Sequence, residues 1–98
     1  MKTVSAKKAF GTATFERIHA AKHHAWEDAF EIEFESGISY LLSHAELRKA
    51  NNLSKEAPEV QSVQVDPELR SGFYVSYVDG SKAEASWELV KESTPTRL

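Results

Sequence analysis

The sequence predicts a single α+β domain, built from a mostly antiparallel sheet of two hairpins with one or two short helices on its face. Three observations support this fold class. Residues 30–34 and 73–77 alternate apolar and polar side chains, as half-buried strands do. A glycine-containing turn follows each segment, at Ser36-Gly37 and Asp79-Gly80. A serine then begins a short helical pattern in each half of this 98-residue chain.

The first hairpin is predicted over residues 29–42. Its first strand alternates strictly between apolar and acidic residues, and residues 38–42 form the return strand. Because side chains alternate between the two faces of a strand, the apolar residues share one face and the glutamates share the other. We expect these apolar residues to face the core: Phe30, Ile32 and Phe34. We expect these acidic residues to face solvent: Glu31, Glu33 and Glu35.

A helix is predicted directly after this hairpin. Ser43 and Glu46 have the spacing of a capping box, in which the serine accepts a hydrogen bond from the first turn of the helix. Good helix formers continue to Ala50, and Asn51-Asn52 is a plausible stop because asparagine accepts the left-handed conformation.

The second half follows the same plan. Residues 60–65 form a β-rich run, residues 73–85 form a hairpin, and Ser86 caps a helix over residues 87–92. Aligned positions in the two halves are 43 residues apart throughout, as Phe30 and Phe73 are. We therefore predict an internal repeat of residues 30–49 and 73–92.

Residues 12–29 fit both a helical face and a first strand, and the pattern favours a strand over about 13–20 with irregular structure to residue 28. The chain is divided into a basic flexible N-terminus (1–12), a globular domain (13–92) and a flexible tail (93–98).

Composition excludes several function classes. The absence of cysteine excludes disulfides, thiol catalysis and thiolate zinc sites. A net charge of −3 argues against general nucleic-acid binding, since phosphate backbones would be repelled. No apolar run approaches the roughly 18 residues that a membrane span needs, and the first residues lack the apolar segment of a secretory signal. A cytoplasmic protein with no membrane association is expected.

The row of Glu31, Glu33 and Glu35 is the predicted binding surface. An ordered row of carboxylates would steer and orient a basic protein partner. Neither a nucleophile elbow nor a phosphate-binding glycine loop is present, so we expect a non-enzymatic interaction module without a cofactor, such as an inhibitor or antitoxin-like neutraliser. An exposed edge strand could also pair two copies into a homodimer.

A metal- or small-ligand-binding accessory domain is the alternative. His19, His23 and His24 lie close together in sequence, with Glu27 and Asp28 nearby, and the candidate ligands are the three histidines and Glu27. On a helix, the first two would be four residues apart and could share a metal ion, whereas a strand would separate them.

Two resemblances add to these expectations. Residues 63–69, 72–80 and 87–90, together with the hairpin at 30–37, resemble small bacterial domains of unknown function, including one often encoded beside toxin-like proteins. Glu46-Leu47-Arg48 and the Asp-Gly…Trp pattern also resemble the N-terminal domain of gamma-butyrobetaine hydroxylase. Metal-binding members of that second family use cysteines, so the resemblance implies no zinc role here.

Overall fold

A computed structural model describes residues 14–54, 58–93 and 96–98; the segment expected to be a basic flexible N-terminus, 1–12, lies outside these residues. The described residues form two helices and seven strands. In chain order these are β1 (Ile18–His24), β2 (Ala29–Phe34), β3 (Ser39–Ser43), α1 (His44–Ala50), β4 (Val60–Val65), β5 (Gly72–Tyr77), β6 (Lys82–Ser86), α2 (Trp87–Glu92) and β7 (Thr96–Arg97).

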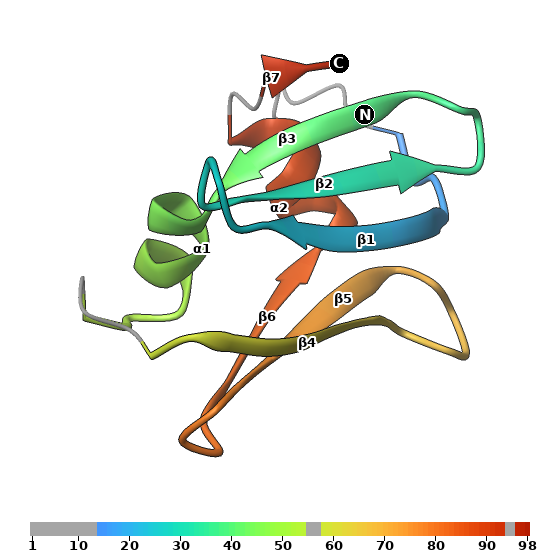
Figure 1. The fold of residues 1–98 in the computed structure, drawn as a ribbon. Helices are drawn as coiled ribbons and strands as arrows, with labels where there is room; N and C mark the ends of the chain where they lie inside the picture. Colours follow the sequence, from blue (N-terminus) through green and yellow to red (C-terminus); the bar gives the residue numbers. More distant parts are fainter. Residues whose placement is uncertain (1–13, 55–57, 94–95) are drawn as a thin grey trace.

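The strands form two antiparallel sheets, in the orders β1-β2-β3-β7 and β4-β5-β6. Figure 1 shows one sheet above the other, with β1 beside β4, α1 at one end and α2 behind. The α+β prediction is confirmed. Each predicted hairpin lies in its own sheet. β1 and β7 flank the β2–β3 hairpin, and β4 flanks the β5–β6 hairpin.

The core fills the space between the two sheets. The alternating residues of both hairpins face it as predicted, and Tyr77 is fully buried there with the others. The buried cluster is Ile18, Phe30, Ile32, Phe34, Leu42, Leu47, Phe73, Val75, Tyr77, Ala83, Ala85 and Val90. The glutamates between the apolar residues of β2 stay outside this core.

The internal repeat extends to backbone detail. β5, β6 and α2 each begin 43 residues after β2, β3 and α1. Gly37 and Gly80 both adopt the left-handed region, with φ of 93° and 92°. β1 and β4 each carry a register irregularity at their first paired residues. The two halves are therefore structural copies of one strand–hairpin–helix unit.

Both helices begin at the predicted serine caps. The Ser43 hydroxyl accepts a hydrogen bond from the Glu46 amide at 3.1 Å, and the Ser86 hydroxyl accepts one from the Leu89 amide at 3.2 Å. Asn52, with φ of 57°, takes the left-handed conformation just beyond α1. Within the described residues, neither helix is long and apolar enough to cross a membrane.

The first strand lies further along the chain than the sequence pattern suggested. A strand over about 13–20 with irregular structure to 28 was expected, whereas β1 covers Ile18–His24 and only residues 25–28 form a turn. The reason is cross-strand pairing, since residues 22–24 pair with residues 29–31 of β2. At the other end, Thr96–Arg97 forms β7 against β3, within the segment expected to be a flexible tail.

Several strand edges are covered within the chain. Asn51 bonds the backbone of Glu84 on β6 twice, donating to its carbonyl at 2.9 Å and accepting from its amide at 3.1 Å. The Arg70 guanidinium donates to the carbonyls of Ile18 and His19 on β1. These contacts occupy backbone groups that a second copy would need, so the predicted edge-strand homodimer has fewer open positions.

Replacing Gly72 by alanine is expected to destabilise the fold by about 1–3 kcal/mol, because the added Cβ would lie 2.6 Å from the carbonyl oxygen of Ala85. Urea denaturation measures the loss. Lys82→Ala is the control, since this exposed side chain lies on β6, the strand that Gly72 approaches, and its loss adds no Cβ near the backbone. An equal loss in both variants would contradict the close approach of β5 and β6.

Candidate metal centre

Four polar side chains from four separate segments meet at the end of the molecule beside α1. His23 lies near the end of β1, Asp28 closes the following turn, His44 is the first residue of α1, and Tyr77 is the last residue of β5. The sequence separates the histidines by 21 positions, so the site exists only in the folded chain.

Local backbone structure positions Asp28 and His44, the two residues at the centre of this group. Asp28 has φ of 51°, a conformation that aspartate tolerates better than most residues, and this ends the turn. Its carbonyl accepts a hydrogen bond from the His44 amide at 3.0 Å. The turn is therefore tied to the start of α1, and the two side chains extend from adjoining backbone positions.

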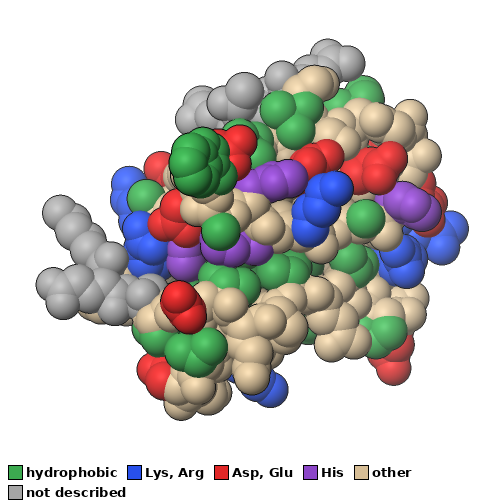
Figure 2. Space-filling model, in the orientation of Figure 1, with side chains coloured by type: hydrophobic (Ala, Val, Ile, Leu, Met, Phe, Trp, Pro, Cys, Tyr) green, Lys and Arg blue, Asp and Glu red, His purple; other side chains and the backbone are tan. Residues whose placement is uncertain are grey.

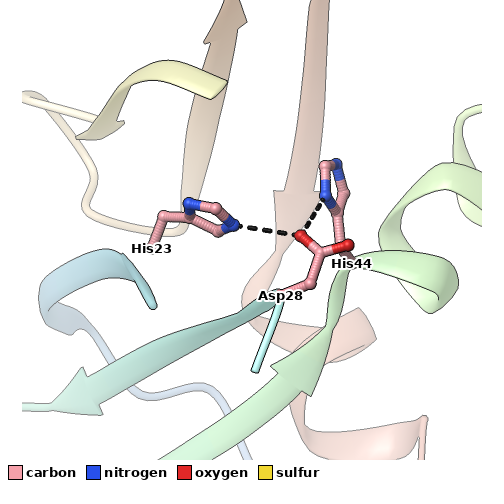
Figure 3. Close-up of side chains that lie close together, drawn as sticks. All are labelled: His23, Asp28 and His44. Atoms are coloured by element: carbon pink, nitrogen blue, oxygen red, sulfur yellow. Dashed lines mark hydrogen bonds and ion pairs between the residues drawn. The ribbon is translucent and has the colours of Figure 1, made fainter. Parts of the chain in front are cut away.

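The Asp28 carboxylate lies between the two imidazoles, as Figure 3 shows. Its Oδ1 atom is 3.1 Å from Nε2 of His23 and 2.8 Å from Nδ1 of His44. These three atoms all lie within 4.8 Å of one another, and within the described residues no other histidine and carboxylate group of three is this close. Two nitrogens and one oxygen converging in this way form a potential set of metal ligands.

A second layer of contacts holds the ligand atoms in place. Nε2 of His44 is 2.8 Å from the Tyr77 hydroxyl, and Oδ2 of Asp28 is 3.6 Å from Nη1 of Arg48. The Phe30 and His44 rings form a T-shaped pair, with 5.2 Å between their centroids. His44 and Asp28 thus each have a partner at the side-chain atom that a metal ion would not use.

Burial differs sharply across the site. His44 is 3% exposed and Tyr77 is fully buried, whereas the Asp28 side chain is 51% exposed. The site is therefore anchored in the interior and open to solvent on its carboxylate side. That opening provides the entry path that a metal-binding site needs.

Two pKa values follow from these surroundings. Burial alone would raise the pKa of Asp28, but the hydrogen bonds from His44 and His23 and the charges of His44 and Arg48 outweigh it, so its pKa lies below 3.8. Burial raises the pKa of the Tyr77 hydroxyl. At neutral pH the carboxylate is therefore charged and the phenol is protonated.

The histidines proposed from the sequence do not come together as a set. His23 joins the site. His24 does not, because its Nε2 atom is 2.7 Å from Oε1 of Glu31 in a separate contact. His19 and Glu27 are outside the group that converges. Asp28 was noted beside the histidines in the sequence but was not included among the candidate ligands. His44 and Tyr77 were missed, because they share no spacing with the histidine cluster and join it only through tertiary packing.

The glutamate row points away from the core, as expected, but basic residues on β1 and directly before it pair with part of the row. Glu31 is 4.0 Å from Nζ of Lys22, and Glu35 is 3.6 Å from Nε of Arg17. Among the described residues, Glu33 has no such partner. Figure 2 shows acidic, basic and histidine side chains interspersed on this face rather than a continuous acidic surface.

The internal repeat shows what the fold itself requires at these positions. The counterparts of Asp28, His44 and Tyr77 in the other half are Ser71, Trp87 and Phe34. The same backbone hydrogen bond is kept there, from the Trp87 amide to the Ser71 carbonyl at 2.8 Å. The backbone thus forms without a carboxylate, an imidazole or a phenol, so the group of Asp28, His44 and Tyr77 is not a requirement of the architecture.

Comparisons with known proteins identify no relative. No protein-family model, no curated protein and no solved structure matches the chain. The resemblances to small bacterial domains and to the hydroxylase N-terminal domain therefore stay predictions, and the site is interpreted from its own chemistry.

Asp28→Asn is expected to be less stable than the wild type at neutral pH, by about 1 kcal/mol because the side chain is half exposed. A lowered pKa in the folded state gives stability that is present above 3.8 and lost as pH falls through the folded value. The gap between the two proteins should therefore narrow below about pH 4.

Urea denaturation at pH 6 and pH 3 measures this gap. Asparagine keeps the shape of the side chain and tolerates the left-handed backbone, so the comparison isolates the charge. Glu16 and Asp79, whose pKa values are also lowered, are present in both proteins and cancel. A gap of constant size at both pH values would show that the carboxylate charge does not stabilise the fold.

Proposed function

We propose that this protein is a small, non-enzymatic metal-binding domain that holds one zinc-like divalent ion. The ligands are Nε2 of His23, Nδ1 of His44 and Oδ1 of Asp28. The single observation that carries the proposal is the convergence of these three atoms within 4.8 Å beside an opening to solvent.

The distances suit a tetrahedral ion after small side-chain rotations. Zinc bonds to nitrogen and oxygen at about 2.0–2.1 Å, which places neighbouring ligands roughly 3.3 Å apart. The two distances from Oδ1 of Asp28, 3.1 Å and 2.8 Å, are close to that value. Three protein ligands would leave a fourth position, on the exposed carboxylate side, for water or another group.

The donor set favours a transition metal over magnesium or calcium. Imidazole nitrogens suit zinc, copper and nickel, whereas magnesium and calcium take oxygen ligands. Arg48 beside Oδ2 of Asp28 leaves Oδ1 as the free oxygen and orients the carboxylate for single-atom coordination.

Untagged protein is expected to bind one equivalent of Zn²⁺ at neutral pH, and not Mg²⁺, in isothermal titration calorimetry. His23→Gln and Asp28→Asn should each weaken zinc binding about tenfold or more, because each removes a ligand atom. His19→Gln and His24→Gln are matched controls on the same strand and should bind as the wild type does. Loss of binding in these controls, with binding kept in Asp28→Asn, would move the site elsewhere.

A second candidate is the docking of a basic protein partner on the glutamate row. The observation that favours it is Trp26, which is 97% exposed in the turn that joins β1 to β2. Exposed tryptophans are frequent energetic centres of protein interfaces, and Glu33 would add charge attraction. An inhibitor or antitoxin-like role would use this surface.

Glu33→Lys and Trp26→Ala should each reduce capture of a basic partner from lysate of the native host, and higher salt should weaken the wild-type capture. Glu68→Lys is the control, since it makes the same charge change outside the row. Circular dichroism checks the fold of each variant. Capture that is unchanged in both Glu33→Lys and Trp26→Ala would count against this surface.

A further inference from the structure

We propose that Tyr77 is a positioning residue for the metal: its hydroxyl holds the His44 ring so that Nδ1 faces the ion. This inference rests on the proposed metal-binding function. It adds a residue that would contact a ligand side chain, His44, but not the ion itself. It also explains why a phenol lies in an otherwise apolar core.

The hydroxyl oxygen is the atom that distinguishes Tyr77 from its counterpart in the repeat. Phe34 occupies the equivalent place at the end of β2 and is also buried. A hydroxyl buried without a partner costs about 1–3 kcal/mol, so its presence at position 77 calls for one. His44 is the partner that the described residues provide, with Nε2 at 2.8 Å.

The surroundings of His44 fix the ring in one orientation. The Tyr77 and His44 rings are nearly parallel, at 6°, with centroids 5.7 Å apart. Phe30 and His23 each form a T-shaped pair with the His44 ring, at interplanar angles of 86° and 72°. With Nε2 turned toward the buried hydroxyl, Nδ1 must face Asp28 and the opening.

The direction of the Tyr77 hydrogen bond should depend on the metal. Nδ1 of His44 lies 2.8 Å from Oδ1 of Asp28 and Nε2 lies 2.8 Å from the Tyr77 hydroxyl. In the tautomer whose Nδ1–H donates to Asp28, Nε2 accepts a hydrogen bond from that hydroxyl. When Nδ1 bonds the ion, its proton leaves to solvent and Nε2 carries a proton instead, taken from solvent. Nε2–H then donates to the Tyr77 oxygen, which is the second contact that metal-bound histidines usually make.

Tyr77→Phe is expected to weaken zinc binding by about tenfold, since the loss of such a second contact typically lowers metal affinity by that factor or more. The variant recreates the residue found at position 34, so we expect it to fold. Tyr74→Phe is the matched control, because Tyr74 lies on the same strand and is exposed on the opposite face. Titration calorimetry of the three untagged proteins compares their affinities.

Nitrogen-15 NMR of the His44 ring supplies a readout that a purely structural role would not change. In the wild type, the ring proton should be on Nδ1 without zinc and on Nε2 with one equivalent of zinc. In Tyr77→Phe, zinc should no longer be confined to Nδ1 of His44, because no hydroxyl then holds Nε2 away from the ion, while Tyr74→Phe should keep zinc on Nδ1.

Each outcome decides between the two proposals. Wild-type zinc binding at His23, Asp28 and His44 with equal affinity in Tyr77→Phe would overturn the role of Tyr77 alone. Coordination through Nε2 of His44 would also overturn it. An absence of zinc binding in the wild type would overturn the proposed function and this inference together.

Discussion

The link between Asp28 and His44 is the interaction on which the site depends. It has two parts, a backbone hydrogen bond of 3.0 Å from the His44 amide to the Asp28 carbonyl and a side-chain bond of 2.8 Å from Nδ1 to Oδ1. The first belongs to the fold, because the other half of the chain has the same bond between Trp87 and Ser71. The second is specific to the candidate site, because only this half of the chain has side chains that can form it.

The repeat thus distinguishes the backbone contacts that form the fold from the side-chain contacts that form the candidate site. Two copies of the same unit enclose one core, and each copy places a turn residue against the first residue of its helix. One copy fills this place with Ser71 and Trp87, and the other fills it with a carboxylate and an imidazole. Tyr77 reaches the polar end from the opposite sheet, so the site joins the two halves of the molecule.

Much of the fold could be predicted from the sequence, because its signals are local. Alternation at residues 30–34 and 73–77, the two glycine turns and the serine caps each act within a few residues, and all appear in the structure. The bounds of β1 were harder to predict, since they depend on pairing with β2 rather than on the weak alternation of residues 13–20.

The site could not be predicted in the same way. His23 was a candidate because it lies near other histidines, yet its partners are 5 and 21 residues away in the chain. Asp28 and His44 look like a turn residue and a helix-start residue, and Tyr77 looks like a core aromatic. Their chemistry appears only when the turn, the helix and the second sheet are packed together.

A crystal structure of the protein grown with zinc, with anomalous data collected at the zinc edge, tests the account most directly. We predict one anomalous peak per chain, about 2.0–2.1 Å from Nε2 of His23, Nδ1 of His44 and a carboxylate oxygen of Asp28. A peak on His19, His24 or Glu31 instead, or no peak in a crystal soaked well above stoichiometry, would contradict it.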